Sequence, residues 1–299
     1  MKGEGNMFAH QAIDDLEKLD DCGYYQKSWA NLVPLIKKSQ CFHMGDINDV
    51  LNSVKHEKGN IFIDNASFMR LPHKFCWFDA VTNDANDGAL KFGAIIFNYD
   101  EHVISAIIFI FPKIKPVWML VPIEFVFNIE KEFTTEQIKK LFPGTKPPKF
   151  QTSDGCFSKM MIKPLIPGIG DKVQNMAVIG TKYLTAIENT ILLLNCKNIQ
   201  TETIKAPEAL NKKRRRNGKQ EIFDYHVLNV VVPGKKRGYS PETEPLSHNR
   251  VHLCRGHFKE YTSEHPLFGH LTGLYWWQPH VRGQNKSGIV VKDYNVKTA

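Results

Sequence analysis

The order of apolar and polar residues predicts a helical beginning to the chain. In residues 8–22, apolar side chains recur at three- or four-residue spacing among charged neighbours, which predicts an amphipathic helix. Further helices are expected across Pro34 and over residues 46–54, the second of these capped by Asp46. The first quarter of the chain is therefore predicted to be helical.

The middle of the chain changes to a strand pattern, with runs of β-branched and aromatic residues. These runs lie at residues 61–63, 75–81, 90–99, 103–111 and 117–127. They are apolar on both faces, so helices must cover the sheet that they form, namely the N-terminal helices and a helical segment within residues 170–196. We therefore predict an α+β fold in which an antiparallel sheet is covered by helices.

Loops and charge divide the rest of the chain. Proline and glycine at residues 143–155 predict a surface loop, and the five consecutive basic residues from Lys212 to Arg216 predict an exposed one. A strand is expected at residues 223–232, followed by a second basic loop at 233–245. We expect two domains: residues 1–200 form the helical N-terminus and the sheet with its covering helices, and residues 211–299 form a basic, histidine- and tryptophan-rich module.

The positive charge of the protein is concentrated at one end. Residues 211–299 contain sixteen Lys and Arg against seven Asp and Glu, although the whole chain carries a net charge of only +8. The remaining residues are therefore close to neutral. Such asymmetry indicates a polyanionic partner for the basic part, with phosphate contacts that weaken as salt rises; the alternative is a solvated basic face.

Residues 250–283 gather arginine, histidine and aromatic side chains at strand spacing. Read at period two, each of two strands has a cationic face and an apolar face. The cationic faces consist of Arg255, His257 and Lys259 in the first strand and of Gln278, His280 and Arg282 in the second. We predict a basic hairpin closed by a loop at residues 262–273, with a third strand at residues 289–296 beside it.

Cationic and aromatic side chains together are suited to RNA, because guanidinium groups bind phosphates and rings stack on unpaired bases. The predicted RNA-binding residues are Arg250, His252, Arg255, His257, Tyr261, Trp276, Trp277, His280 and Arg282, with Lys212, Lys213, Arg214, Arg215 and Arg216 from the basic run. The alternative is that these arginines and histidines satisfy buried polar groups and that both tryptophans fill core.

Two chemical roles for the same block are weaker hypotheses. His257 and His280 as acid and base, with Arg255 or Arg282 stabilising the phosphate transition state, would make a metal-independent ribonuclease. A zinc site at His252, Cys254 and His257 would need a bulge, because the two histidines point to opposite faces of a strand. We expect binding rather than catalysis, with no cofactor and no metal.

Sequence features that would place the chain in a membrane or outside the cell are missing. No stretch has the roughly 18 apolar residues that a membrane helix needs, and the first ten residues contain no hydrophobic signal region. The six cysteines are scattered and form no CxxC pair, which favours reduced thiols. We therefore expect a cytoplasmic protein that does not bind membranes.

The C-terminal block also resembles a known family. The order Arg250-Val-His252-Leu-Cys254-Arg255-Gly256-His257-Phe258, then Tyr261 and Trp277-Gln278-Pro279-His280, is similar to the ending of a phage and mobile-element family that includes a type V-A anti-CRISPR protein, an inhibitor of Cas12a production. Upstream, Leu71-Pro72 followed by Cys76-Trp77-Phe78-Asp79 fits the pattern of the same family. The chain departs from that pattern in a longer loop before Trp277 and in its own basic run.

This resemblance implies a function in counter-defence within a bacterial host. It implies a non-catalytic inhibitor that recognises a protein or nascent-peptide target, such as a CRISPR effector, and lowers its production. The basic module would then contact RNA or the translating ribosome. The alternatives are a stand-alone RNA-binding protein or the metal-independent endoribonuclease described above, and direct inhibition through protein contact.

Overall fold

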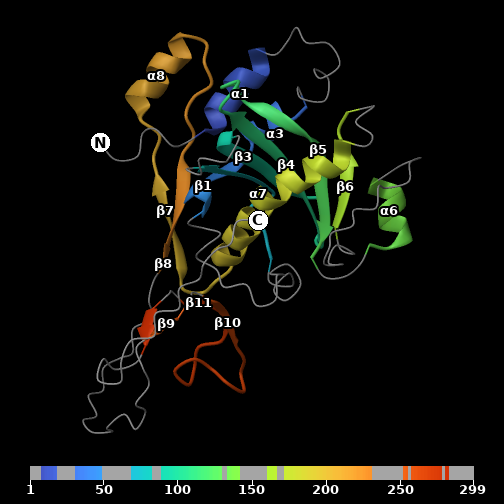
Figure 1. Ribbon diagram of the computed structural model, residues 1–299. Coiled ribbons are helices and arrows are strands. Elements are labelled where there is room, and N and C mark those ends of the chain that lie inside the picture. Colours follow the sequence, from blue (N-terminus) through green and yellow to red (C-terminus); the bar gives the residue numbers. More distant parts are fainter. Residues whose placement is uncertain are drawn as a thin grey trace.

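An eight-stranded sheet forms the centre of the computed structural model, and helices cover both of its faces (Figure 1). The structure describes residues 8–18, 31–48, 69–82, 89–129, 133–141, 160–166, 172–230, 252–254, 257–277 and 280–282. Two small two-stranded ladders lie near the C-terminus. The α+β class predicted from the sequence is confirmed.

The helices and strands are interleaved along the chain. The helices are α1 (Ala9–Lys18), α3 (Val33–Lys37), α6 (Thr135–Leu141), α7 (Lys172–Leu194) and α8 (Glu208–Arg216). The large sheet contains β1 (Gln40–Asp46), β2 (Phe75–Val81), β3 (Ala89–Asn98), β4 (Val103–Pro112), β5 (Met119–Asn128), β6 (Met160–Pro164), β7 (Ile199–Ile204) and β8 (Tyr225–Val230). The C-terminal ladders contain β9 (His252–Cys254), β10 (His257–Tyr261), β11 (Gly273–Trp277) and β12 (His280–Arg282).

The large sheet is mixed rather than purely antiparallel. Its strand order is β6-β5-β4-β3-β2-β1-β8-β7, and β2 to β6 form the antiparallel meander that the sequence predicts. The sheet is not antiparallel throughout, because β1 pairs in parallel with both β2 and β8. Residues 40–46 have no strand alternation and lie in the part that we predicted to be helical, so β1 was missed.

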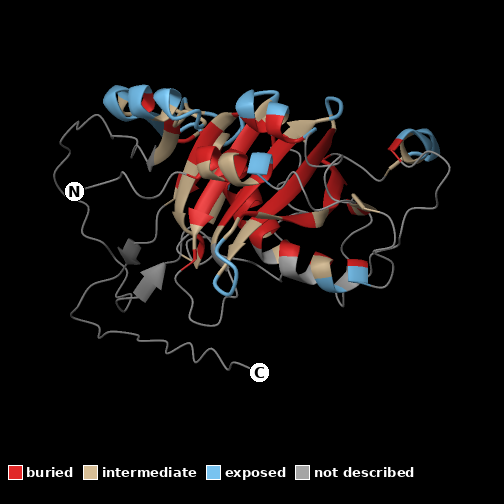
Figure 2. Ribbon diagram, turned by 90° about the horizontal axis from the view of Figure 1, so that it is seen from above, coloured by how far each residue is buried: buried red, intermediate tan, exposed pale blue. Residues whose placement is uncertain are grey.

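Each face of the sheet carries its own apolar core. The α7 helix covers one face, where Gly180 lets it approach so closely that an added Cβ would lie 2.5 Å from the Phe125 ring. The α1 and α3 helices cover the other face, where Phe8 and Ile36 pack in the same cluster as Trp77. Buried residues therefore run through nearly every strand of the sheet, as Figure 2 shows.

The structure places residues 199–230 in the main body. The predicted strand at residues 223–232 is confirmed as β8, but it lies between β1 and β7 in the large sheet instead of in a separate C-terminal module. The α6 helix and the edge strands β6 and β7 were not predicted. The expected strands at residues 61–63 and 289–296, and the expected loops at 143–155 and 233–245, lie outside the described residues.

Candidate nucleic-acid interface

The basic run that we predicted to be an exposed loop forms the second half of helix α8, so that prediction is wrong in its secondary structure. Residues 208–216 are good helix formers, and Pro207 precedes the first turn in an extended conformation. Glu208 lies in the first turn and the cations lie in the last turn, which suits the helix dipole. The helix ends before Gly218, which takes a positive φ of 63°.

Polar contacts fix α8 against α1 and against the following chain. The Arg214 guanidinium lies 2.5 Å from Asp14 Oδ2 and also donates to the Gln220 carbonyl at 2.6 Å. The Gln220 N–H donates to the other oxygen of Asp14 at 2.9 Å. Asn211 exchanges two hydrogen bonds with the backbone of Ile222. The position of α8 on the body is therefore well defined.

The remaining cations of α8 face solvent. The exposed basic residues are Lys212, Lys213, Arg215 and Arg216, with Lys219 just beyond the helix. Arg215 forms a weak exposed ion pair with Glu221 at 3.5 Å. Of the five predicted RNA-binding residues in this run, Arg214 is thus already neutralised by Asp14, whereas the other four are presented outward from a short helix.

The predicted C-terminal hairpin exists, and it is attached to the body. Strands β10 and β11 pair in antiparallel fashion and are joined by residues 262–272, close to the predicted loop. The Asn198 side chain exchanges two hydrogen bonds with the backbone of Trp276, and the Lys197 N–H donates to the Leu274 carbonyl. The hairpin therefore docks on the chain that leaves α7.

Docking of the hairpin separates its aromatic residues. Trp276 is only 5% exposed and packs on Phe258, with ring centroids 4.9 Å apart, so in this arrangement its ring belongs to the core. Tyr261 is partly exposed, and Lys259 Nζ lies 4.8 Å above its ring. Tyr261 and Lys259 remain available to a ligand in a way that Trp276 does not.

The observed register differs from the predicted sorting into one cationic and one apolar face. His257 lies opposite Trp277, and the backbones of His280 and Arg282 lie opposite those of Cys254 and His252. Each of these pairs joins a residue from the predicted cationic face to one outside it. In the β10–β11 ladder, where directly opposite residues share a face, the predicted cationic face of the first strand therefore continues into the predicted apolar face of the second. Arg250 and Arg255 lie outside the described residues, and the proposed catalytic quartet, which includes Arg255, therefore lies partly outside them.

Asp79 forms a buried polar network that sequence reasoning did not assign to any role. Its Oδ2 accepts hydrogen bonds from the Phe8 N–H and the Trp77 indole, both at 2.9 Å, and from the Tyr225 hydroxyl at 2.7 Å. Its Oδ1 lies 2.7 Å from Nδ1 of His43. The available signal was one carboxylate in the otherwise apolar strand β2.

The Asp79 network connects to α8 through α1. Because Asp79 and Tyr225 bind the first N–H groups of α1, they hold this helix on the sheet. In the same first turn, burial and then the Arg214 charge lower the pKa of His10 to about 4, so His10 is neutral at pH 7. The start of α1 and the basic helix thus form one connected unit with β2 and β8.

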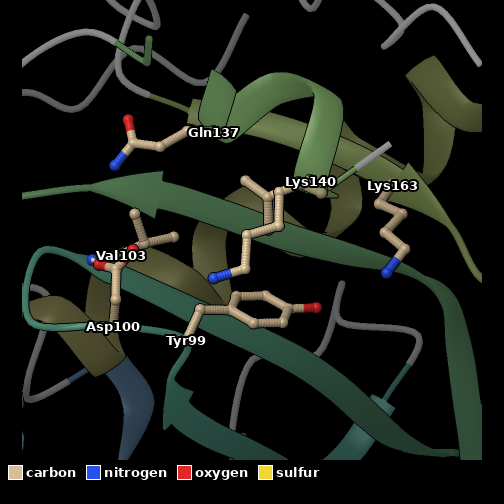
Figure 3. Close-up of a pocket in the computed structure, with 7 residues that line it drawn as sticks. Tyr99, Asp100, Val103, Gln137, Lys140 and Lys163 are labelled. Carbon is tan, nitrogen blue, oxygen red and sulfur yellow. Dashed lines mark hydrogen bonds between the residues drawn. The ribbon is translucent and has the colours of Figure 1, made fainter. Parts of the chain in front are cut away.

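A small pocket lies at the other end of the sheet, beneath α6 (Figure 3). It has a volume of about 120 Å³, and Lys140 and Lys163 lie over Tyr99 at its rim. The Tyr99 hydroxyl donates to the buried Glu124 at 2.5 Å, and Lys163 lies 3.3 Å from the same carboxylate. The polar groups of this pocket therefore satisfy one another to a large extent.

Within the described ranges, no group of three or more His, Cys, Asp or Glu side chains is arranged to hold a metal ion. Among the helices that the structure describes, none is long and apolar enough to cross a bilayer. The thiols of Cys41, Cys76 and Cys196 are free and buried.

Comparison with known proteins does not identify a relative. No family model matches the chain, and neither a curated protein nor a solved structure matches it. The residues of the chain and the geometry of α8 are therefore the basis for inferring its function.

Proposed function

We propose that this protein is a cytoplasmic, mobile-element counter-defence protein that binds RNA or the translating ribosome through its basic part and lowers production of a protein target. The observation that carries the RNA contact is the exposed row of cations on α8. Of five consecutive basic residues, the four other than the sequestered Arg214 are exposed on a fixed helix, and one of them has a weak acidic partner. A rigid helix binds phosphates without first losing the conformational entropy of a loop.

The hairpin supplies a second contribution to the proposed RNA contact. Lys259 and Tyr261 lie two residues apart on β10 and so share a face. The ring of Tyr261 meets that of Tyr275 edge to face, with ring centroids 5.7 Å apart. A cation beside an open ring suits a phosphate and a neighbouring base. In this proposal the α8 cations provide most of the affinity and the hairpin adds base stacking.

Recognition of a protein or nascent-peptide target is supported by the C-terminal resemblance described above. The target, for instance a CRISPR effector, would be bound by the body of the protein while the basic part contacts RNA or the ribosome. A pull-down from translating bacterial cells tests this directly, with sequencing of bound RNA and identification of bound peptides. If the pull-down enriches no RNA and no ribosomal material, the proposed contact with RNA or the ribosome is contradicted.

The alternative function is a stand-alone RNA-binding protein or endoribonuclease that needs no protein partner. It predicts RNA affinity in isolation that is sensitive to Arg255→Ala and Arg282→Ala, and cleavage that is lost in His257→Ala. Intact RNA after incubation with purified protein would reject the nuclease. Loss of affinity on changing α8, with these residues intact, would favour α8 as the binding element.

The RNA contact is tested with matched double variants of the full chain. Binding of a fluorescein-labelled single-stranded RNA is followed by anisotropy for Lys212→Gln/Lys213→Gln and for Lys113→Gln/Lys115→Gln, which removes two exposed lysines of the β4–β5 connection. We expect the α8 variant to bind roughly tenfold more weakly near physiological salt, because each lost phosphate contact removes about 0.7 from the slope of log affinity against log salt. Equal weakening in both variants would indicate that only net charge matters.

A further inference from the structure

Strand β7 is an open edge of the large sheet. It is the last strand in the order, it pairs with β8, and among the described residues no strand pairs with its outer side (Figure 1). Five of its six residues are exposed, so both of its faces as well as its edge reach solvent. Alternate residues of such a strand direct N–H and C=O groups outward, ready to pair with another strand.

The opposite edge of the same sheet is protected. In β6, Met160 and Ile162 are buried, and Pro164 at its end cannot donate a backbone hydrogen bond. Helix α6 adds further cover, because Leu141 belongs to a small cluster against which Met161 packs. Strand β7 contains no proline and is rich in threonine and isoleucine, which favour strand pairing. Of the two edge strands that the structure describes, β7 is therefore the one suited to association.

We propose that β7 pairs with β7 of a second copy of this chain, so that two sheets join into one continuous sheet. A two-fold axis perpendicular to the sheet relates two identical antiparallel strands. Directly opposite residues of antiparallel strands share a face. The register must therefore be centred on one residue, which lies opposite its own copy, and not between two successive residues. A register that keeps five of the six residues paired is centred either on Thr201 or on Glu202.

Side-chain chemistry selects the register centred on Thr201. That register places Thr201 opposite its own copy, Gln200 opposite Glu202, and Ile199 opposite Thr203. Threonine pairs and amide–carboxylate pairs are favourable across strands. The register centred on Glu202 would set two carboxylates directly opposite each other, which is destabilising.

The pairing has a consequence for the basic helices, although it does not itself depend on the proposed function. Helix α8 contacts α1, which covers one face of the sheet, and a perpendicular two-fold axis keeps that face on the same side in both copies. Two α8 helices would therefore lie on one side of the dimer. A single RNA could then engage both, with a gain in avidity.

Cysteine cross-linking tests the pairing in the absence of RNA. Thr201→Cys and Thr203→Cys each place one thiol on the same exposed strand, and the wild-type chain gives the background from its own cysteines. In the predicted register the two Cα atoms at position 201 lie about 5 Å apart, within disulfide range. Those at position 203 are four residues out of register, roughly 14 Å along the strands.

We expect mild oxidation to give at least about fivefold more cross-linked dimer from Thr201→Cys than from Thr203→Cys. Light scattering of the wild-type chain should show a mass that rises with concentration, because a five-residue strand pair makes a small and weak interface. Equal cross-linking by the two variants, or none above wild type, would overturn the proposal. So would a chain that stays monomeric at every concentration, which is the result expected if the edge instead receives an extended segment of another protein.

Discussion

Single buried polar residues decide how the parts of this protein are held together. Asp79 binds four hydrogen-bonding groups from four parts of the chain, one of them its own strand, and through Phe8 it fixes the start of α1. Asp14, on the same helix, then binds Arg214. A carboxylate on the central sheet thus helps to position a basic helix that is far from it in sequence.

Glu188 on α7 is a buried carboxyl group without such partners. It is fully buried, and neither of its carboxyl oxygens has a hydrogen-bond partner within the described part of the chain. Burial raises the pKa of Glu188 well above its ordinary value of 4.5, so the carboxyl group is neutral in the folded protein. The unfolded chain releases this proton above pH 4.5, and stability is therefore lost as pH rises from there towards the raised pKa.

We predict that Glu188→Gln stabilises the protein, because glutamine keeps the shape of the side chain and cannot ionise. The gain should be small at pH 5 and should grow to roughly 1–3 kcal/mol at pH 8. Urea unfolding at both pH values measures it, with the exposed Glu136→Gln on α6 as the control. A variant that is less stable than wild type at pH 8 would show that Glu188 is ionised and paired.

At the level of elements, α8 shows how charge and helix propensity can be confused. A run of five basic residues indicates a solvated loop if charge alone is considered. The same residues have high helix propensity, and tertiary contacts on both sides of Arg214 complete the helix. The anchoring of α8 should therefore be as important for binding as its exposed charge.

We predict that Asp14→Ala weakens RNA binding although it removes no exposed cation. The change leaves the mostly buried Arg214 and the Gln220 N–H without their acceptor, at a cost of about 2 kcal/mol. Hydrogen exchange at residues 208–216 should become faster and RNA affinity should fall. The control is Glu17→Ala, which breaks the exposed ion pair with Lys37 and should have almost no effect. Unchanged exchange in α8 would contradict this account of its anchoring.

The strands of the meander could be predicted because each is a long apolar run. Predicted and observed bounds of β2 to β5 agree to within two residues. Strand β7 has the polar sequence Ile-Gln-Thr-Glu-Thr-Ile and is exposed. It therefore contains no apolar run that would predict a strand. The parallel pairing of β1 depends on contacts between distant segments, which a local pattern does not contain.

The candidate site was predictable in its composition and not in its arrangement. The basic run and the aromatic hairpin were both found from the sequence, and the hairpin loop lies where it was expected. Which side chains remain accessible to a ligand could not be predicted, because it depends on how the hairpin and α8 pack on the body. Asn198 binds the backbone of Trp276 and so turns one ring inward, while Asp14 neutralises one of the five cations.

Across the whole molecule, positive charge and apolar core occupy different places. The large sheet is buried through most of its strands, while α8 is exposed at its periphery (Figure 2). Residues 211–299 carry nine more positive than negative charges, and the rest of the chain is nearly neutral. Among the described residues, the exposed cations of α8 therefore form a local centre of attraction for a polyanion.

The salt dependence of RNA affinity tests this account most directly. The logarithm of the dissociation constant is measured against the logarithm of salt concentration for the wild-type chain and for Lys212→Gln/Lys213→Gln/Arg215→Gln/Arg216→Gln. If the four exposed cations of α8 bind phosphates, the slope should fall by about 0.7 for each lost contact, to a total of nearly 3. A variant that keeps the wild-type slope would contradict the claim that α8 is the polyanion-binding element.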